Sequence, residues 1–208
     1  MCPCEQSGTL KGGVNMNVKD RIEQFMNFMQ LPDGTPITTP ELIDWLIAHG
    51  FFLKPAAIKH HGNHTGGLFE HSLMVASVLV DMTQCLDLKW SRPESPYIIG
   101  MLHDVCKLDD YTDKNASDVV VMGGGSVVSS NPEWVYNDEQ MFKGHGSKSV
   151  QMLSTIMSLT EEEMYCIRFH MGAYVTDEWN FYDNAIRKYE NVLWTHTADM
   201  YASKVKDM

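Results

Sequence analysis

The feature that most constrains this chain is a His103–Asp104 pair at the end of a stretch that reads as a buried helix. Ser95-Pro96 is typical of a helix start, and apolar residues follow it at helical spacing as far as Leu102. A buried carboxylate needs a cation or several hydrogen-bond donors to offset the loss of its hydration. Neighbouring residues on a helix point about 100° apart, so the pair can converge on one ion only near a helix end. The sequence therefore predicts a helix that ends inside the core, with a cation or donors beside Asp104.

Four more histidine and aspartate residues lie in patterns that place them close to the core. His71 falls on the apolar stripe of a helix predicted over residues 68–86. His170 follows apolar residues at three-residue spacing, and Asp199 lies in the last predicted helix. His145 stands between two glycines, which let backbone and ligand approach closely. With the first pair, these residues spell H…HD…H…H…D along the chain.

These six side chains are all potential metal donors. A single histidine on an apolar helix face is more often a well-packed core residue than a ligand, and His71 alone would be read in that way. Six donors in this order on successive helices indicate a metal cluster instead. Imidazole and carboxylate together suit Mn, Fe, Co, Ni or Zn, whereas Mg suits imidazole less well. We therefore expect one or two divalent metal ions, and a metal-dependent hydrolase if the six residues converge.

The remaining patterns predict an all-α fold with one small β-hairpin or loop insertion. Helices are expected over residues 17–30, 40–49, 68–86, 95–104, from 147 onward, 160–170 and 183–205. The hairpin is expected over residues 119–128, with a further strand at 134–136. Thr39-Pro40 and Thr160-Glu161-Glu162-Glu163 carry the signatures of helix starts. We expect three segments: a poorly ordered leader at 1–16, a helical extension at 17–59 that packs on the core, and the main domain at 60–208.

Charge and composition restrict the partners of the chain. The net charge of −11 over 208 residues argues against a broad nucleic-acid surface, so no long nucleic acid is expected. A nucleotide in a pocket remains compatible with this charge, because metal ions can supply local positive charge. Cysteine usage indicates a reducing, cytoplasmic setting. No apolar run approaches the roughly 18 residues that span a bilayer, so no membrane is expected.

Five short motifs contain the predicted donors. They are Gly66-Gly67-Leu68-Phe69-Glu70-His71-Ser72, His103-Asp104-Val-Cys-Lys107, Lys143-Gly-His145-Gly, Phe169-His170-Met-Gly and His196-Thr-Ala-Asp199-Met. The first two resemble the G-G-L-x-E-H-[ST] and H-D-x-x-K elements of the HD-domain superfamily of metal-dependent phosphohydrolases. The next two resemble the extra histidines of its dinuclear members, and the last resembles its closing aspartate element. Over residues 60–204 the chain is closest in motif to the HD domain of bacterial 3′–5′ exoribonuclease-like proteins.

The resemblance implies an all-α HD-domain bundle that holds one or two metal ions, with Mn or Fe favoured. The implied ligands of the first ion are His71, His103, Asp104 and Asp199. Asp104 would bridge to a second ion held by His145 and His170. A water between two such ions is acidified towards neutral pH, and the resulting hydroxide would attack phosphorus in line.

Other residues near the motifs are candidates for contact with the substrate. Lys107 would neutralise a phosphate oxygen as charge develops, and we assign it a catalytic role with Asp104. His61 and His64 would contact phosphate or protonate the leaving oxygen, and Arg168 would contact phosphate. Each has a plainer interpretation, as a solvated lysine, a polar loop histidine or a surface arginine. His196 would orient the closing aspartate.

The leading hypothesis is an enzyme of the phosphodiesterase or nucleotidase class. It would cleave a phosphoester of a nucleotide, a dinucleotide or a short oligonucleotide, and the acidic net charge favours a small substrate. One alternative keeps the fold without the chemistry, as a nucleotide-sensing or partner-binding module. Another is a structural helical protein whose histidines are incidental. The sequence leaves open whether the chain forms a homodimer.

Overall fold

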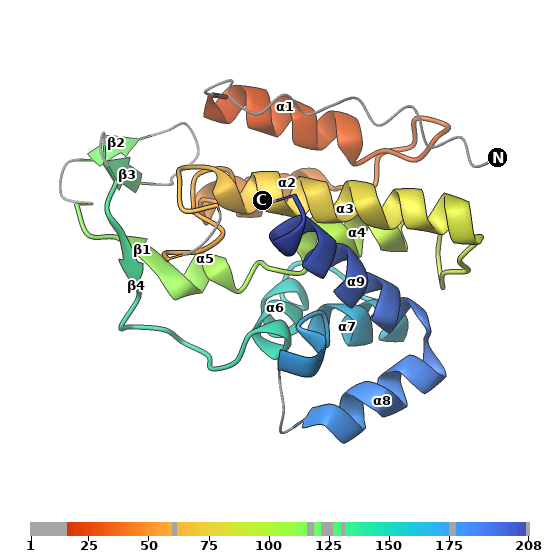
Figure 1. Ribbon diagram of the computed structural model, residues 1–208. Helices are drawn as coiled ribbons and strands as arrows, with labels where there is room; N and C mark the ends of the chain where they lie inside the picture. Colours follow the sequence, from red (N-terminus) through yellow and green to blue (C-terminus); the bar gives the residue numbers. More distant parts are fainter. Residues whose placement is uncertain are drawn as a thin grey trace.

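The computed structural model is an assembly of helices with a small β element at one side (Figure 1). It describes residues 16–59, 62–115, 119–121, 127–129, 132–174 and 178–206. The helices are α1 (Val18–Phe28), α2 (Pro40–Ala48), α3 (Gly67–Leu86), α4 (Ser95–Leu102), α5 (Lys107–Asp110), α6 (Gly146–Leu153), α7 (Glu161–Arg168), the 3-10 helix η1 (Gly172–Tyr174), α8 (Trp179–Lys188) and α9 (Asn191–Lys204). The prediction of an all-α fold with a small hairpin is confirmed. The leader expected at 1–16 lies outside the described residues apart from residue 16.

Local capping explains where several helices begin. Thr39 accepts a hydrogen bond from the Leu42 amide at 3.3 Å, with Pro40 in the first helical position of α2. Thr160 and Glu163 form a reciprocal capping box at the start of α7, with N–O distances of 3.2 and 2.8 Å. Both starts agree with the sequence prediction.

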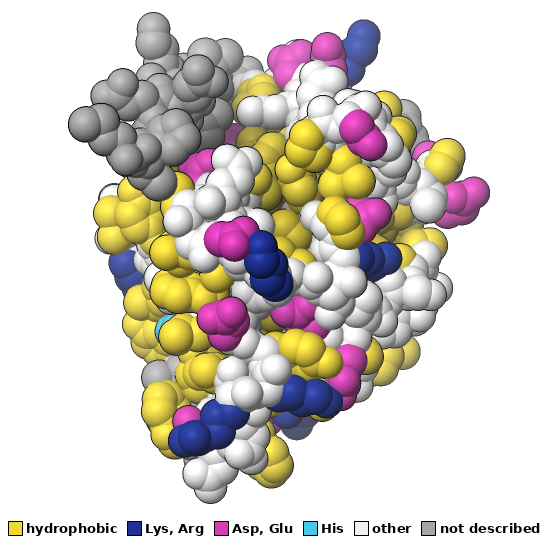
Figure 2. Space-filling model, turned by 90° about the vertical axis from the view of Figure 1, so that its right-hand side faces the viewer, with side chains coloured by type: hydrophobic (Ala, Val, Ile, Leu, Met, Phe, Trp, Pro, Cys, Tyr) yellow, Lys and Arg dark blue, Asp and Glu magenta, His cyan; other side chains and the backbone are white. Residues whose placement is uncertain are grey.

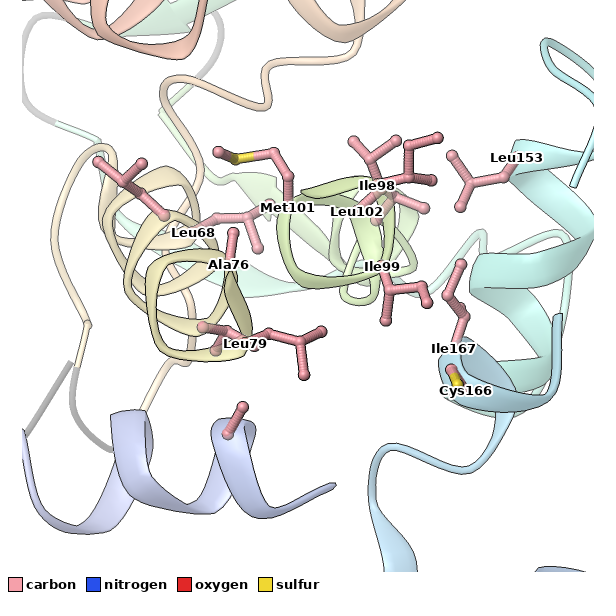
Figure 3. Close-up of a cluster of buried hydrophobic side chains, with 14 of the residues drawn as sticks. Leu68, Ala76, Leu79, Ile98, Ile99, Met101, Leu102, Leu153, Cys166 and Ile167 are labelled. Atoms are coloured by element: carbon pink, nitrogen blue, oxygen red, sulfur yellow. The ribbon is translucent and has the colours of Figure 1, made fainter. Parts of the chain in front are cut away.

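The core is built around α3 and α4. Figure 3 shows α4 lying between α3 and α7, with Leu68, Ala76 and Leu79 of α3 on one side and Cys166 and Ile167 of α7 on the other. A Cβ atom at Gly100 would lie 2.3 Å from the Ala76 Cα, so only glycine allows this approach of α4 to α3. Helix α9 packs against α3, α4 and α7. The ends of α4 and α7 therefore meet in the interior beside α9.

The N-terminal helices contribute to the same core. Phe52 contacts Phe25, Phe51 and Phe69 edge-on or tilted, with ring centroids 5.2 to 5.6 Å apart. Arg21 is buried, and its guanidinium donates to the Thr65 carbonyl at 2.8 Å. These contacts link α1 and the segment after α2 to the start of α3. The division of the chain into domains stays a prediction.

The β structure consists of two antiparallel pairs. Strands β2 (Val119–Val121) and β3 (Val127–Ser129) form the expected hairpin. Strand β4 (Trp134–Tyr136) was also expected, but its partner β1 (Tyr111–Asp113) was not. Because β1 follows α5 directly, this pair extends from the chain segment just beyond the His103–Asp104 pair.

The helix predicted over residues 183–205 is wrong in its extent. The structure has two helices there, α8 and α9, because Tyr189 adopts an extended backbone with φ −136° and ψ 103°. The interruption lets the two helices take different directions (Figure 1). None of the described helices is long and apolar enough to cross a bilayer. On the face drawn in Figure 2, acidic and basic side chains are interspersed among hydrophobic ones.

Candidate metal centre

The six predicted donors come from five parts of the fold. His71 lies near the start of α3, and His103 caps the end of α4 with Asp104 directly after it. His145 precedes α6, His170 follows the end of α7, and Asp199 lies within α9. The structure brings them together. The groups whose donor atoms lie within 4.8 Å of one another include His71–His103–Asp104, Asp104–His145–His170 and His103–His170–Asp199.

Asp104 lies at the centre of this cluster and is almost completely buried. Its Oδ2 lies 3.6 Å from the His71 Nε2 and 3.5 Å from the His103 Nε2. Its Oδ1 lies 2.8 Å from the His145 Nε2 and 3.3 Å from the His170 Nε2. Each carboxylate oxygen of Asp104 therefore faces a different pair of imidazoles.

Asp199 completes the first of these two donor sets. Its Oδ1 lies 3.2 Å from the His71 Nε2 and 3.9 Å from the His103 Nε2. The side next to Asp104 Oδ2 therefore offers two imidazoles and two carboxylates. The side next to Oδ1 offers two imidazoles and the shared carboxylate.

Backbone hydrogen bonds orient two of the histidines. The His103 Nδ1 lies 2.9 Å from the Gly100 carbonyl, and the His170 Nδ1 lies 2.6 Å from the Ile167 carbonyl. Because a carbonyl oxygen only accepts, Nδ1 carries the hydrogen in both rings, and in a neutral ring the lone pair is on Nε2. Both Nε2 atoms are buried without a hydrogen-bond partner among the described residues, and the Asp104 Oδ1 beside them faces the ring nitrogens of His145 and His170. Buried polar atoms without partners are rare, and a cation at this point would satisfy both nitrogens.

The charges of the cluster also suit a cation. Burial raises the pKa of the Asp104 carboxyl, but Lys107 and the nearby imidazoles outweigh this effect and hold its pKa well below the usual range. The pKa of Asp199 is also lowered, because hydrogen bonding to His71 and the charges of neighbouring imidazoles outweigh burial. Burial lowers the pKa of His103 to about 3, so this ring is neutral near pH 7. The carboxylate of Asp104 and, less strongly, that of Asp199 outweigh burial at His170 and raise its pKa. Two ionised carboxylates thus face imidazole nitrogens, which is a donor set suited to a divalent metal.

Lys107 is the one lysine that pairs with the cluster within the described part of the chain. Its Nζ lies 2.5 Å from the Asp104 Oδ2, at the start of α5. Burial lowers the pKa of Lys107, but the charge of Asp104 and the hydrogen bond to it raise the pKa above its ordinary value. Lys107 is therefore a fixed positive charge beside the donors.

Cys106 contacts one of the donors. Its Sγ lies 3.3 Å from the His145 Nδ1, on the ring edge opposite the atom that faces Asp104. Cys106, Asp110 and His145 also form a group of mutually close donor atoms. Asp110 already pairs with Lys148 at 2.6 Å, and burial raises the pKa of the Cys106 thiol well above its usual range. Cys106 is thus better suited to orient His145 than to bind a metal.

The weaker substrate candidates lie in different surroundings. His64 is more than half exposed, and its Nε2 lies 2.8 Å from the Glu70 carboxylate. Arg168 hydrogen-bonds Ser147 and pairs with Glu178 at 2.9 Å. Neither lines the pocket described below, and their contact with substrate stays a prediction. His61 lies outside the described residues.

His196 does not act as the sequence suggested. Its Nδ1 lies 2.7 Å from the backbone carbonyl of His170, so it braces the segment that carries His170 and is not seen to orient Asp199. Gly172 permits this placement, because a Cβ atom there would lie 2.7 Å from the His196 ring. The contact of His196 with the His170 carbonyl depends on how α9 packs against the end of α7.

A pocket of about 270 Å³ opens beside the donor cluster. His71, Asp104, His145 and Asp199 line it together with Lys107. Its other lining residues are Ala56, Ala57, Tyr111, Met171, Tyr174, His196, Met200, Ser203 and Lys204. The sequence did not single out Tyr174, Ser203 or Lys204. Ser203 lies four residues after Asp199, so both side chains are expected on one face of a helix. This spacing could have predicted that Ser203 lies near the site.

Fold and site together define an all-helical protein with a buried histidine and aspartate cluster that could hold a divalent metal. Comparison with models of protein families, with curated proteins and with solved structures found no match for this chain. The assignment of a function therefore rests on the geometry of the site and on the motifs.

Proposed function

We propose that this chain is an HD-type metal-dependent phosphohydrolase that acts on a nucleotide, a dinucleotide or a short oligonucleotide. The observation that carries the proposal is the position of Asp104, whose two carboxylate oxygens lie against two different pairs of histidines. A carboxylate placed in this way is suited to bridge two ions. Paired metal ions are typical of enzymes that hydrolyse phosphoesters.

The ligand assignment follows from these distances. His71, His103 and Asp199 with the Asp104 Oδ2 would hold one ion, and His145 and His170 with Oδ1 would hold the other. Mn or Fe is favoured for this mixture of nitrogen and oxygen donors. When bound, such ions supply Lewis-acid chemistry, which offsets charge on a phosphate and activates water near neutral pH.

The other residues of the site have complementary roles. Lys107 holds a positive charge at the inner end of the pocket, where the phosphate of a substrate would lie. The pocket volume of about 270 Å³ lies just below the usual range of roughly 300 to 1,000 Å³ for small-molecule sites. Together with the net charge of −11, this volume favours a small phosphorylated substrate over a long polyanion.

The central test compares the wild type with Asp104→Asn, which keeps the side-chain shape but removes the charge. We expect the wild type to bind about two Mn²⁺ per chain and to release phosphate from a nucleotide or cleave a short oligonucleotide. Asp104→Asn should lose at least one ion and reduce turnover by a factor of about 100 or more. Asp183→Asn removes an exposed carboxylate that pairs with Arg187, and it should change neither result.

Metal content is measured by elemental analysis after dialysis, and hydrolysis by a screen of nucleotides and short oligonucleotides. A wild-type protein that takes up neither Mn nor Fe would refute the proposed function. Metal uptake with nucleotide binding but no cleavage across the screen would favour the nucleotide-sensing module instead.

A further inference from the structure

The pocket continues from the donor cluster along α9 to the end of that helix. Asp199 lies at its inner end, and Met200, Ser203 and Lys204 line it further along. Lys204 is five residues beyond Asp199, which is about 7.5 Å along a helix axis. A ligand that reaches both ends must therefore extend well past the phosphate bound at the cluster.

Lys204 is a cation at this outer end that no carboxylate neutralises among the described residues. Lys107, the other lysine of the pocket, already pairs with Asp104 at 2.5 Å. The next lysine on the chain, Lys206, lies over the ring of Tyr201 and does not line the pocket. In a chain with net charge −11, a lysine at the pocket mouth with no carboxylate partner in the described part of the chain favours an anionic ligand group.

Three other lining residues of the pocket are suited to the uncharged part of a nucleotide. Met171 and Met200 line the pocket with thioether side chains, and Tyr174 is 61% exposed. Exposed aromatic rings bind nucleobases by stacking, and methionine adapts to flat apolar groups. The small volume of the pocket leaves room for one nucleoside unit.

We propose that the substrate is a nucleotide that carries two separate phosphate groups, and that Lys204 binds the phosphate that is not cleaved. This inference rests on the proposed function, which places the scissile phosphate at the donor cluster. A nucleoside monophosphate bound there would present only its neutral sugar and base to Lys204. A second phosphate on the other side of the sugar would give Lys204 a charged partner and would select this substrate class.

The test measures dissociation constants of adenosine 5′-monophosphate and adenosine 3′,5′-bisphosphate on Mn²⁺-loaded protein, with phosphate release followed in the same samples. We expect the wild type to bind the bisphosphate about tenfold more tightly, which is the scale of one charge-assisted contact. Lys204→Met should abolish this preference and weaken the binding of the monophosphate far less than that of the bisphosphate. Lys204→Arg should preserve the preference, and Lys206→Met is the matched control with no expected effect.

The outcomes separate this inference from the proposed function. Equal binding of the two nucleotides by the wild type, or a preference that survives in Lys204→Met, would overturn the role of Lys204 while leaving a phosphohydrolase intact. A wild type that takes up neither Mn nor Fe, and so binds neither nucleotide in a metal-dependent manner, would overturn both proposals.

Discussion

At the scale of single residues, Asp104 and its neighbours show how a buried charge is arranged for a metal. One oxygen of Asp104 faces His71 and His103, and the other faces His145 and His170. Lys107 offsets part of the negative charge, but the Nε2 atoms of His103 and His170 stay buried without hydrogen bonds in the described part of the chain. Such atoms are costly in a folded protein unless a ligand satisfies them.

The contact between Cys106 and His145 gives a prediction at the same scale. Cys106→Ala removes the partner of the His145 Nδ1, and we expect the affinity for the second metal ion to fall about tenfold. His145 is the most exposed of the six donors, with 31% of its side chain accessible, so it depends most on such a partner. Co²⁺ titration followed by optical absorption would resolve the two binding steps.

Two further variants distinguish the hydrogen bond of Cys106 to His145 from a contribution of Cys106 to packing. Cys106→Ser keeps an atom that can hydrogen-bond the ring and should recover most of the affinity. Cys166→Ala truncates another fully buried cysteine, which lies in the core, and should lower stability without changing the second binding step. Equal loss of metal in the Cys106→Ala and Cys166→Ala variants would show that packing alone is responsible.

At the scale of elements, the second donor set depends on how closely α6 approaches α7. A Cβ atom at Gly146 would lie 2.1 Å from the Arg168 carbonyl oxygen, which leaves no room for any side chain. The sequence suggested that the glycines beside His145 admit a ligand, but the structure shows that Gly146 admits the neighbouring helix. This approach is what sets His145 beside His170, with ring centroids 5.0 Å apart.

Gly146→Ala should therefore separate the two histidines of the second set without disturbing the first. We expect the number of bound Mn²⁺ ions to fall from about two to one, with a loss of stability of roughly 1 to 3 kcal/mol from overpacking. Elemental analysis and urea unfolding would measure the two effects. Full retention of two ions in a folded Gly146→Ala protein would contradict this account of the second set.

At the scale of the whole molecule, the donors connect α3, α4, α7 and α9 with the segment before α6. A ligand that binds only the folded chain stabilises it by mass action, by about 2.7 kcal/mol at one hundred times its dissociation constant. For a chain of this size we expect Mn²⁺ to raise the unfolding temperature by roughly 5 to 10 °C, and chelation to reverse the change. The measurement is calorimetry of the wild type and of Asp104→Asn, whose unfolding temperature should respond far less to Mn²⁺.

The sequence by itself determined the local features of this protein. Helical periodicity placed His71 on an inward face, capping residues set the starts of α2 and α7, and Asp104 was expected at a helix end. These features depend on residues within one or two turns, so they can be read along the chain. The motifs also identified the six residues that the structure brings together.

Only the tertiary structure decided how these residues meet. Which oxygen of Asp104 faces which histidine depends on the packing of helices far apart in the sequence. The same holds for the contact of Cys106 with His145 and for the pocket that ends at Lys204. Periodicity assigns a side chain to a face of its own helix, whereas the position of one helix against another is set by close packing across the core. The sequence therefore supplied the donors and their order, and the packing of the helices placed Asp104 between the two sets.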